Sequence, residues 1–94
     1  MNNVDIARER CEYASKLLTK NNIPHAIKNA DIGHINLLKN EKVVMSFWAR
    51  TGRYIYTINP KNISNIVTID PDYDRGIQNC INCYKNTFLK QEEN

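Results

Sequence analysis

Long apolar runs, glycine, proline and paired cysteines are all scarce in this sequence, and these scarcities exclude several classes of protein. No stretch approaches the roughly 20 apolar residues that a membrane span needs, and the N-terminus lacks the apolar run of a signal peptide. The three cysteines are an odd number without a spaced framework, which predicts reduced thiols and no disulfide scaffold. We therefore expect a soluble protein in a cytoplasmic compartment.

The chain is also short and nearly balanced in charge. Its 94 residues, 41% of them hydrophobic, suffice for one modest core, and no repeat, linker or low-complexity segment divides them. We expect a single domain over 1–94, with a frayed polar tail at 90–94. This length predicts a non-enzymatic binding module or small inhibitor, because few enzymes build a deep site at this size. The net charge of +3 favours only weak attraction to polyanions.

Two segments have the spacing of amphipathic helices. The first is predicted to run from about Asn3 to Lys20, before the breaker Pro24. Its apolar residues are Val4, Ala7, Cys11, Ala14 and Leu18. The second is predicted over about Pro71 to Leu89, with Asp70 as N-cap and Gly76 as a weak point. Its apolar stripe contains Ile77, Cys80, Ile81, Tyr84 and Phe88.

Between the helices the hydrophobic period changes to two, which predicts short antiparallel strands. We place them near 24–28, 32–38, 42–49 and 53–58, separated by turn residues, and leave 63–69 open as a loop or a short edge strand. The expected fold is α+β in two layers. It consists of an N-terminal helix, a three- to four-stranded antiparallel meander and a C-terminal helix, with both helices on one face of the sheet.

The hairpin that turns at Thr51-Gly52 separates apolar from polar residues only if its loop has an even number of residues. Its apolar face then carries Val43, Met45, Phe47, Tyr54, Tyr56 and Ile58. A three-residue loop at 39–41 adds Gly33, Ile35 and Leu37 to that face. The opposite face carries His34, Asn36, Ser46, Trp48, Arg50, Arg53, Ile55 and Thr57.

This second face has the composition of a binding surface. Aromatic rings stack on bases or anchor a protein partner, and arginine forks bind phosphates or carboxylates. The region from Lys39 to Lys61 has a local net charge of +4. The predicted partner contacts are His34, Lys42, Trp48, Arg50 and Arg53. The alternative is that Trp48 packs beneath residues 59–69 and the arginines are ordinary surface residues.

Other candidate chemistry has simpler structural explanations, so no catalytic residue, metal or cofactor is predicted. Cys80 and Cys83 stand inside the second helix without a second such pair, which favours packing thiols over zinc or redox chemistry. The aspartates of 70–74 suit a helix start better than a calcium loop. His25 and His34 leave open a small ribonuclease that uses them as acid and base.

Three short motifs carry a resemblance to a known group of proteins: Phe47-Trp48, Thr51-Gly52 and Arg75-Gly76-Ile77. Over about residues 23–85 the chain resembles small uncharacterised phage and prophage proteins, from which it differs by a longer insert at 59–70. The order of elements is also similar to the double-stranded-RNA-binding domain, whose second helix begins with lysines where this chain has an acidic start.

The resemblance to phage proteins implies stoichiometric binding in the cytoplasm of a host cell. Anti-CRISPR inhibitors, which block a Cas effector or its guide RNA, are a prominent class of such proteins. The expected function is therefore a non-enzymatic phage or mobile-element protein that inhibits a host defence nucleoprotein, such as an anti-CRISPR. A direct RNA- or DNA-binding module and the small ribonuclease are the alternatives.

Overall fold

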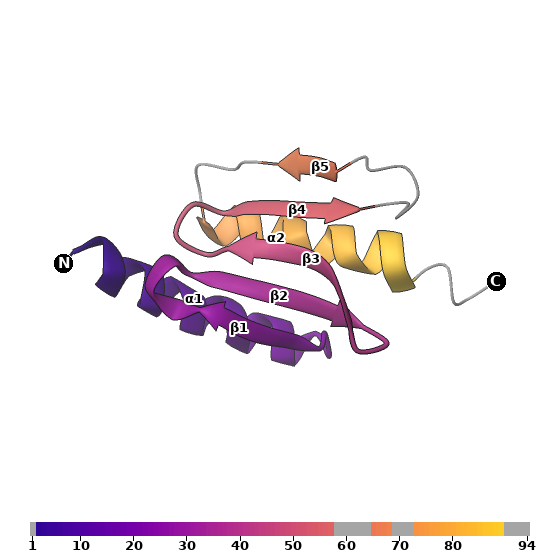
Figure 1. Ribbon diagram of the computed structural model, residues 1–94, viewed down its shortest axis with the longest axis horizontal. Coiled ribbons are helices and arrows are strands. Elements are labelled where there is room, and N and C mark those ends of the chain that lie inside the picture. Colours follow the sequence, from indigo (N-terminus) through magenta and orange to yellow (C-terminus); the bar gives the residue numbers. More distant parts are fainter. Residues whose placement is uncertain (1, 58–64, 69–72, 90–94) are drawn as a thin grey trace.

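Two helices lie on the same face of an antiparallel sheet in the computed structural model, which describes residues 2–57, 65–68 and 73–89 (Figure 1). The described strands form one sheet in chain order, β1-β2-β3-β4-β5. Their bounds are β1 His25–Asn29, β2 His34–Lys39, β3 Lys42–Trp48, β4 Arg53–Thr57 and β5 Asn65–Thr68. The helices are α1 Asn3–Lys20 and α2 Tyr73–Tyr84, and two short helical turns are η1 Ala30–Ile32 and η2 Lys85–Leu89. The predicted α+β class is confirmed.

Helix α1 has the bounds that its sequence pattern predicts. The side chain of Asn2 caps its first turn by accepting a hydrogen bond from the amide of Asp5, at 2.8 Å. The side chain of Asn21 donates to the carbonyl of Leu17 at the other end. Its small apolar residues are fully buried, which lets the helix approach the sheet closely: Ala7, Cys11 and Ala14, followed by Leu18.

Helix α2 buries the stripe that its spacing predicts, but its end differs from the prediction. Ile77, Cys80, Ile81 and Tyr84 are all buried against the sheet. The last five residues, Lys85–Leu89, form a π-helical turn and not a continuation of the α-helix. The Tyr84 hydroxyl donates to the carbonyl of Leu38 at 2.7 Å, which ties this end of α2 to β2. The predicted N-cap Asp70 and the start at Pro71 lie outside the described residues.

The β3–β4 hairpin has the predicted even loop. Residues 49–52 form a four-residue connection, and Trp48 pairs with Arg53 while Phe47 pairs with Tyr54. Met45, Phe47 and Tyr54 are buried beneath the helices, as the alternation predicts. Ile58 and the side chain of Thr57, which the sequence also assigned to a face, are not among the side chains that the structure describes.

The β2–β3 connection corrects the predicted loop length. The turn has two residues, Asn40 and Glu41, and both have positive φ, 52° and 67°. The register then shifts between Leu37 and Leu38, so that Leu37 pairs with Met45 and Val44 is the extra residue of a bulge. The shorter turn and the bulge each shift the pairing by one residue in the same direction, so Ile35 pairs with Phe47 and not with Met45, and a shift of two residues leaves each side chain on the same face. The predicted faces are therefore kept beyond the bulge.

The bulge also overturns the predicted burial of Val43. Its side chain is 55% exposed, whereas Val44 packs against the core. The start predicted for the second strand, at residue 32, is wrong too, because Ile32 belongs to η1. Residues 65–68, which the sequence left open between loop and strand, form the edge strand β5, pairing Tyr54 with Thr68.

A close contact between two glycines joins the hairpin turn to α2. A Cβ atom placed on Gly76 would lie 2.6 Å from both the Cα and the carbonyl oxygen of Gly52. Gly52 itself has a φ of 75°, which favours glycine. Gly76 is the weak point that helix propensity predicts, and here it lets the turn pack directly on the helix backbone.

Candidate binding surface on the sheet face opposite the helices

The sheet face opposite the helices is covered by no described element, and we call it the open face (Figure 1). Of residues 59–69, which the sequence leaves open as an alternative cover for Trp48, only 65–68 are described, and they form the edge strand β5. Strand pairing places two rows of side chains on it. One row runs His34, Trp48, Arg53 across β2, β3 and β4, and the next runs Asn36, Ser46, Ile55. The structure therefore places three of the predicted contact residues side by side on one face.

The His34–Trp48–Arg53 row is a continuous stack. The imidazole of His34 lies parallel to the indole of Trp48, with 4.6 Å between ring centroids and 13° between planes. The guanidinium carbon of Arg53 lies over the same indole, 5.2 Å from its centroid. Because β2 and β4 flank β3 on opposite sides, both faces of the indole are covered. Trp48 is thus held in place by its neighbours and is not a free stacking platform.

His34 is the chemically unusual member of the row. Its Nε2 atom is buried and has no hydrogen-bond partner among the described residues. Burial lowers the pKa of His34, the charge of Lys28 lowers it further, and a hydrogen bond with Asn36 opposes both effects. Ser46 Oγ in turn donates to Asn36 Oδ1 at 3.1 Å. The imidazole is therefore expected to be neutral at neutral pH.

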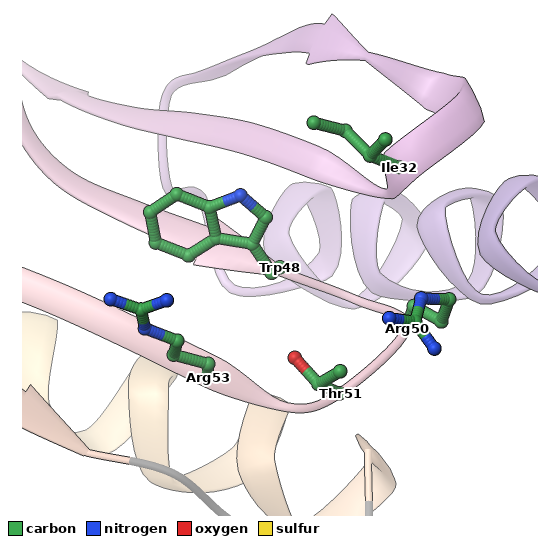
Figure 2. A pocket seen from close by; sticks show the side chains of 5 residues that line it. All are labelled: Ile32, Trp48, Arg50, Thr51 and Arg53. Atoms are coloured by element: carbon green, nitrogen blue, oxygen red, sulfur yellow. The ribbon is translucent and has the colours of Figure 1, made fainter.

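A hollow of about 220 Å³ opens beside this row. Figure 2 shows Trp48 between Ile32 and Arg53, with Arg50 and Thr51 on the hairpin turn. Arg50, Thr51 and Arg53 are exposed, and neither guanidinium forms an ion pair with a described carboxylate. The hollow thus combines two cationic forks, one hydroxyl and two apolar side chains.

The walls of the hollow are fixed by contacts to the rest of the molecule. Arg10 of α1 donates to the carbonyl of Arg50 at 2.6 Å, which anchors the hairpin turn. The amide of Ala49 donates to the carbonyl of Gly33 at 2.8 Å, which joins that turn to η1. On the other wall, Arg8 and Asp31 form a 2.7 Å ion pair that ties η1 to α1. The hollow is therefore preformed.

Two residues of the hollow, Ile32 and Thr51, were missed by the sequence prediction of partner contacts. Ile32 is 49% exposed because η1 turns it away from the core. The signal that was available is the Asn29-Ala30-Asp31 turn: Asn29 caps η1 by accepting from the amide of Asp31.

Lys42, the fifth predicted contact, does not join the others. It stands at the first residue of β3, paired with Lys39, whereas Trp48 is the last residue of that strand. Six residues of extended chain separate their positions by about 20 Å. The predicted set therefore divides into four residues at the end of the sheet that carries the hollow and one at the opposite end.

The two histidines lie on opposite faces of the sheet. His25 pairs with Leu37, a core residue, and is therefore on the helix side. Its Nδ1 donates to the carbonyl of Ile23 at 2.9 Å and its Nε2 accepts from Ser15 Oγ at 2.8 Å. His34 faces the other way, so the two imidazoles do not meet at one site as an acid and a base.

The cysteines are spread through the helical layer. Cys11 and Cys80 are buried, and burial raises the pKa of each thiol. The Cys83 sulfur lies 3.8 Å from the Thr87 hydroxyl. Within residues 2–57, 65–68 and 73–89, no three His, Cys, Asp or Glu side chains are grouped to hold a metal ion.

Comparisons with known proteins found no match among protein-family models, curated proteins or solved structures. None of the helices in the described part of the chain is long and apolar enough to cross a membrane. The functional argument therefore depends on the residues and their geometry.

Proposed function

We propose that this protein is a non-enzymatic phage or mobile-element protein that acts by binding a host defence nucleoprotein, as anti-CRISPR proteins do. The observation that carries the binding role is the preformed hollow beside the His34–Trp48–Arg53 row, with two guanidiniums that have no described carboxylate partner. The assignment to host defence is supported by the resemblance of the hairpin and helix motifs to small phage proteins.

A binding role suits this surface for a physical reason. Aromatic and arginine side chains dominate the energetics of protein interfaces, and a side chain that is already held in place loses less conformational freedom when a partner binds. Here Trp48 is already clamped between His34 and Arg53, and the turn that carries Arg50 is anchored by Arg10. A partner would therefore meet a surface that needs little reorganisation.

A plaquing assay tests the proposed function. Bacterial hosts of low GC content are used, each with a CRISPR system directed against a test phage. They express either the wild-type protein or the double variant Arg50→Gln/Arg53→Gln. The wild type is expected to restore plaques, and the double variant is expected to lose most of that effect. Lys16→Gln/Lys20→Gln, with the same loss of charge on exposed positions of α1, is the matched control and should behave as wild type. Full activity of the hollow variant, or no plaque recovery by any form, contradicts the proposal.

Direct binding of RNA or DNA is the second candidate, and the cations around the hollow favour it. It predicts that affinity for a single-stranded RNA falls steeply between low and physiological salt, because bound counterions are released. No binding of naked RNA at low salt would reject this candidate and leave a protein surface as the contact.

A further inference from the structure

The hollow combines cationic, hydroxyl and apolar side chains, and this combination defines its ligand more narrowly than positive charge alone would. We propose that it receives a carboxylate side chain of a partner protein, presented next to an apolar residue. This inference rests on the proposed binding function and names the chemistry that the partner must bring to the site.

The cationic part of the hollow suits a carboxylate. The guanidinium carbon of Arg53 lies over the Trp48 indole, 5.2 Å from its centroid, and this guanidinium forms no ion pair with a described carboxylate. Arg50 supplies a second fork and Thr51 a hydroxyl on the same rim. A carboxylate accepts two parallel N–H bonds from one such fork, which fixes its orientation as well as its charge.

The apolar part of the hollow favours a ligand that carries a hydrocarbon group beside its carboxylate. Ile32 is half exposed at the wall, and the edge of the Trp48 ring lines the same space. An isolated anion would leave both apolar surfaces in water. An acidic residue followed by an aliphatic residue places a carboxylate and a hydrocarbon group within reach of the two parts together.

The same geometry argues against a nucleic-acid strand as the occupant. Base stacking needs a free ring face, and both faces of Trp48 are covered by His34 and Arg53. A phosphate backbone also needs cations along a track. Lys28 of β1 is near enough for its charge to act on His34. Lys39 and Lys42, however, pair with each other at the opposite end of β2 and β3, and the Lys39 ammonium donates to the carbonyl of Phe88.

A titration of the full chain followed by NMR tests the inference. The probes are an acetylated and amidated tetrapeptide of alternating glutamate and leucine, the same peptide with glutamine for glutamate, inorganic phosphate, and a single-stranded 12-mer RNA. The acidic peptide is expected to shift the indole N–H resonance of Trp48 and the side-chain N–H resonance of Arg53. The glutamine peptide should bind at least about tenfold more weakly, because a charge-assisted pair is lost.

Variants locate the site. Arg50→Gln/Arg53→Gln should abolish the shift of the indole resonance, and Lys16→Gln/Lys20→Gln should keep it. The comparison of the two peptides on the wild-type protein needs no variant, so a folding defect in the double variant does not remove the test. Equal binding of both peptides, no shift with either peptide, or a stronger response to RNA or phosphate would each overturn the inference.

The inference and the proposed function fail in different ways. If plaquing is restored and depends on Arg50 and Arg53 but the acidic peptide does not bind, the carboxylate assignment is wrong and the binding function stands. If the peptide binds as expected but no CRISPR-armed host regains plaques, the host-defence assignment is wrong and the site stands.

Discussion

The most informative single residue is Trp48, whose side chain is half buried although no described helix covers it. Its burial comes from His34 and Arg53 on the two neighbouring strands. Cross-strand pairs of this kind contribute about 0.2–1 kcal/mol each, far less than a residue in the core. Removal of the Trp48 side chain is thus expected to weaken the proposed binding more than it destabilises the fold.

Replacing Trp48 with alanine is therefore expected to lower the free energy of unfolding by only about 1–2 kcal/mol. Phe47→Ala, one residue earlier and fully buried on the helix side, should cost about 3–5 kcal/mol. Urea denaturation of both variants measures the difference. Equal losses would show that Trp48 is a structural residue and would weaken the case for the open face.

The lowered pKa of His34 predicts how the stability of the fold changes with pH. Its pKa is lowered in the folded state, by burial first and by Lys28 second, so the fold favours the neutral imidazole. The stability that this provides is complete above the unfolded pKa of about 6.5. It is lost as the pH falls from there through the lower pKa of the folded state.

Unfolding free energies measured from pH 8 to pH 5 for the wild type and His34→Gln check this expectation. The wild type should lose stability relative to the variant as the pH falls below about 6.5. An NMR titration of His34 that gives a pKa at or above the value of free histidine would contradict the account.

At the scale of elements, the hairpin turn of 49–52 is the key piece, because it contacts both helices. Arg10 of α1 binds the carbonyl of Arg50, and Gly76 of α2 touches Gly52. The turn is thereby held on both sides, and the two arginines that flank the hollow are held with it.

Gly76→Ala should be destabilising although alanine is the better helix former. Alanine gains up to about 1 kcal/mol in helix propensity. Its Cβ would meet backbone atoms of Gly52 at 2.6 Å, which forces the turn away from α2 and is expected to cost about 1–3 kcal/mol or more, a cost that exceeds this gain. Gln78→Ala, at an exposed position of the same helix, is the control and should be neutral or slightly stabilising. Thermal unfolding of both variants distinguishes a steric clash at Gly52 from an effect of helix propensity. A Gly76→Ala variant with a higher melting temperature than the wild type would contradict the close contact.

The elements also show how far sequence reasoning extends. Period-two alternation predicted which sides of β2, β3 and β4 face the helices, because the core tolerates no slip of one residue. It did not predict the two-residue turn at Asn40-Glu41, since a positive φ at Glu41 is unfavourable for that residue by itself. Val43 was consequently assigned to the wrong side of the bulge.

The candidate site was predictable only in part, for a related reason. His34, Trp48 and Arg53 follow from strand register, and the sequence placed them together. Ile32 depends on the short η1 helix, and the contact between Gly52 and Gly76 joins segments distant in the chain. Local patterns carry no information on such contacts.

At the scale of the whole molecule, the residues that stabilise the fold and the residues proposed to bind a partner lie on opposite sides of the sheet. Both helices lie on one side of the sheet and form a single core with it (Figure 1). The open face carries the stacked row and the hollow. Substitutions on the open face are expected to change binding without unfolding the protein, and substitutions in the core are expected to do the reverse.

The affinity of the purified protein for the host nucleoprotein proposed as its partner, measured by calorimetry, tests this account most directly. Arg50→Gln/Arg53→Gln should weaken binding at least about tenfold, as expected for the loss of charge-assisted hydrogen bonds. Its melting temperature should stay near that of the wild type, and Lys16→Gln/Lys20→Gln should change neither quantity. Unchanged affinity of the folded hollow variant would contradict the account.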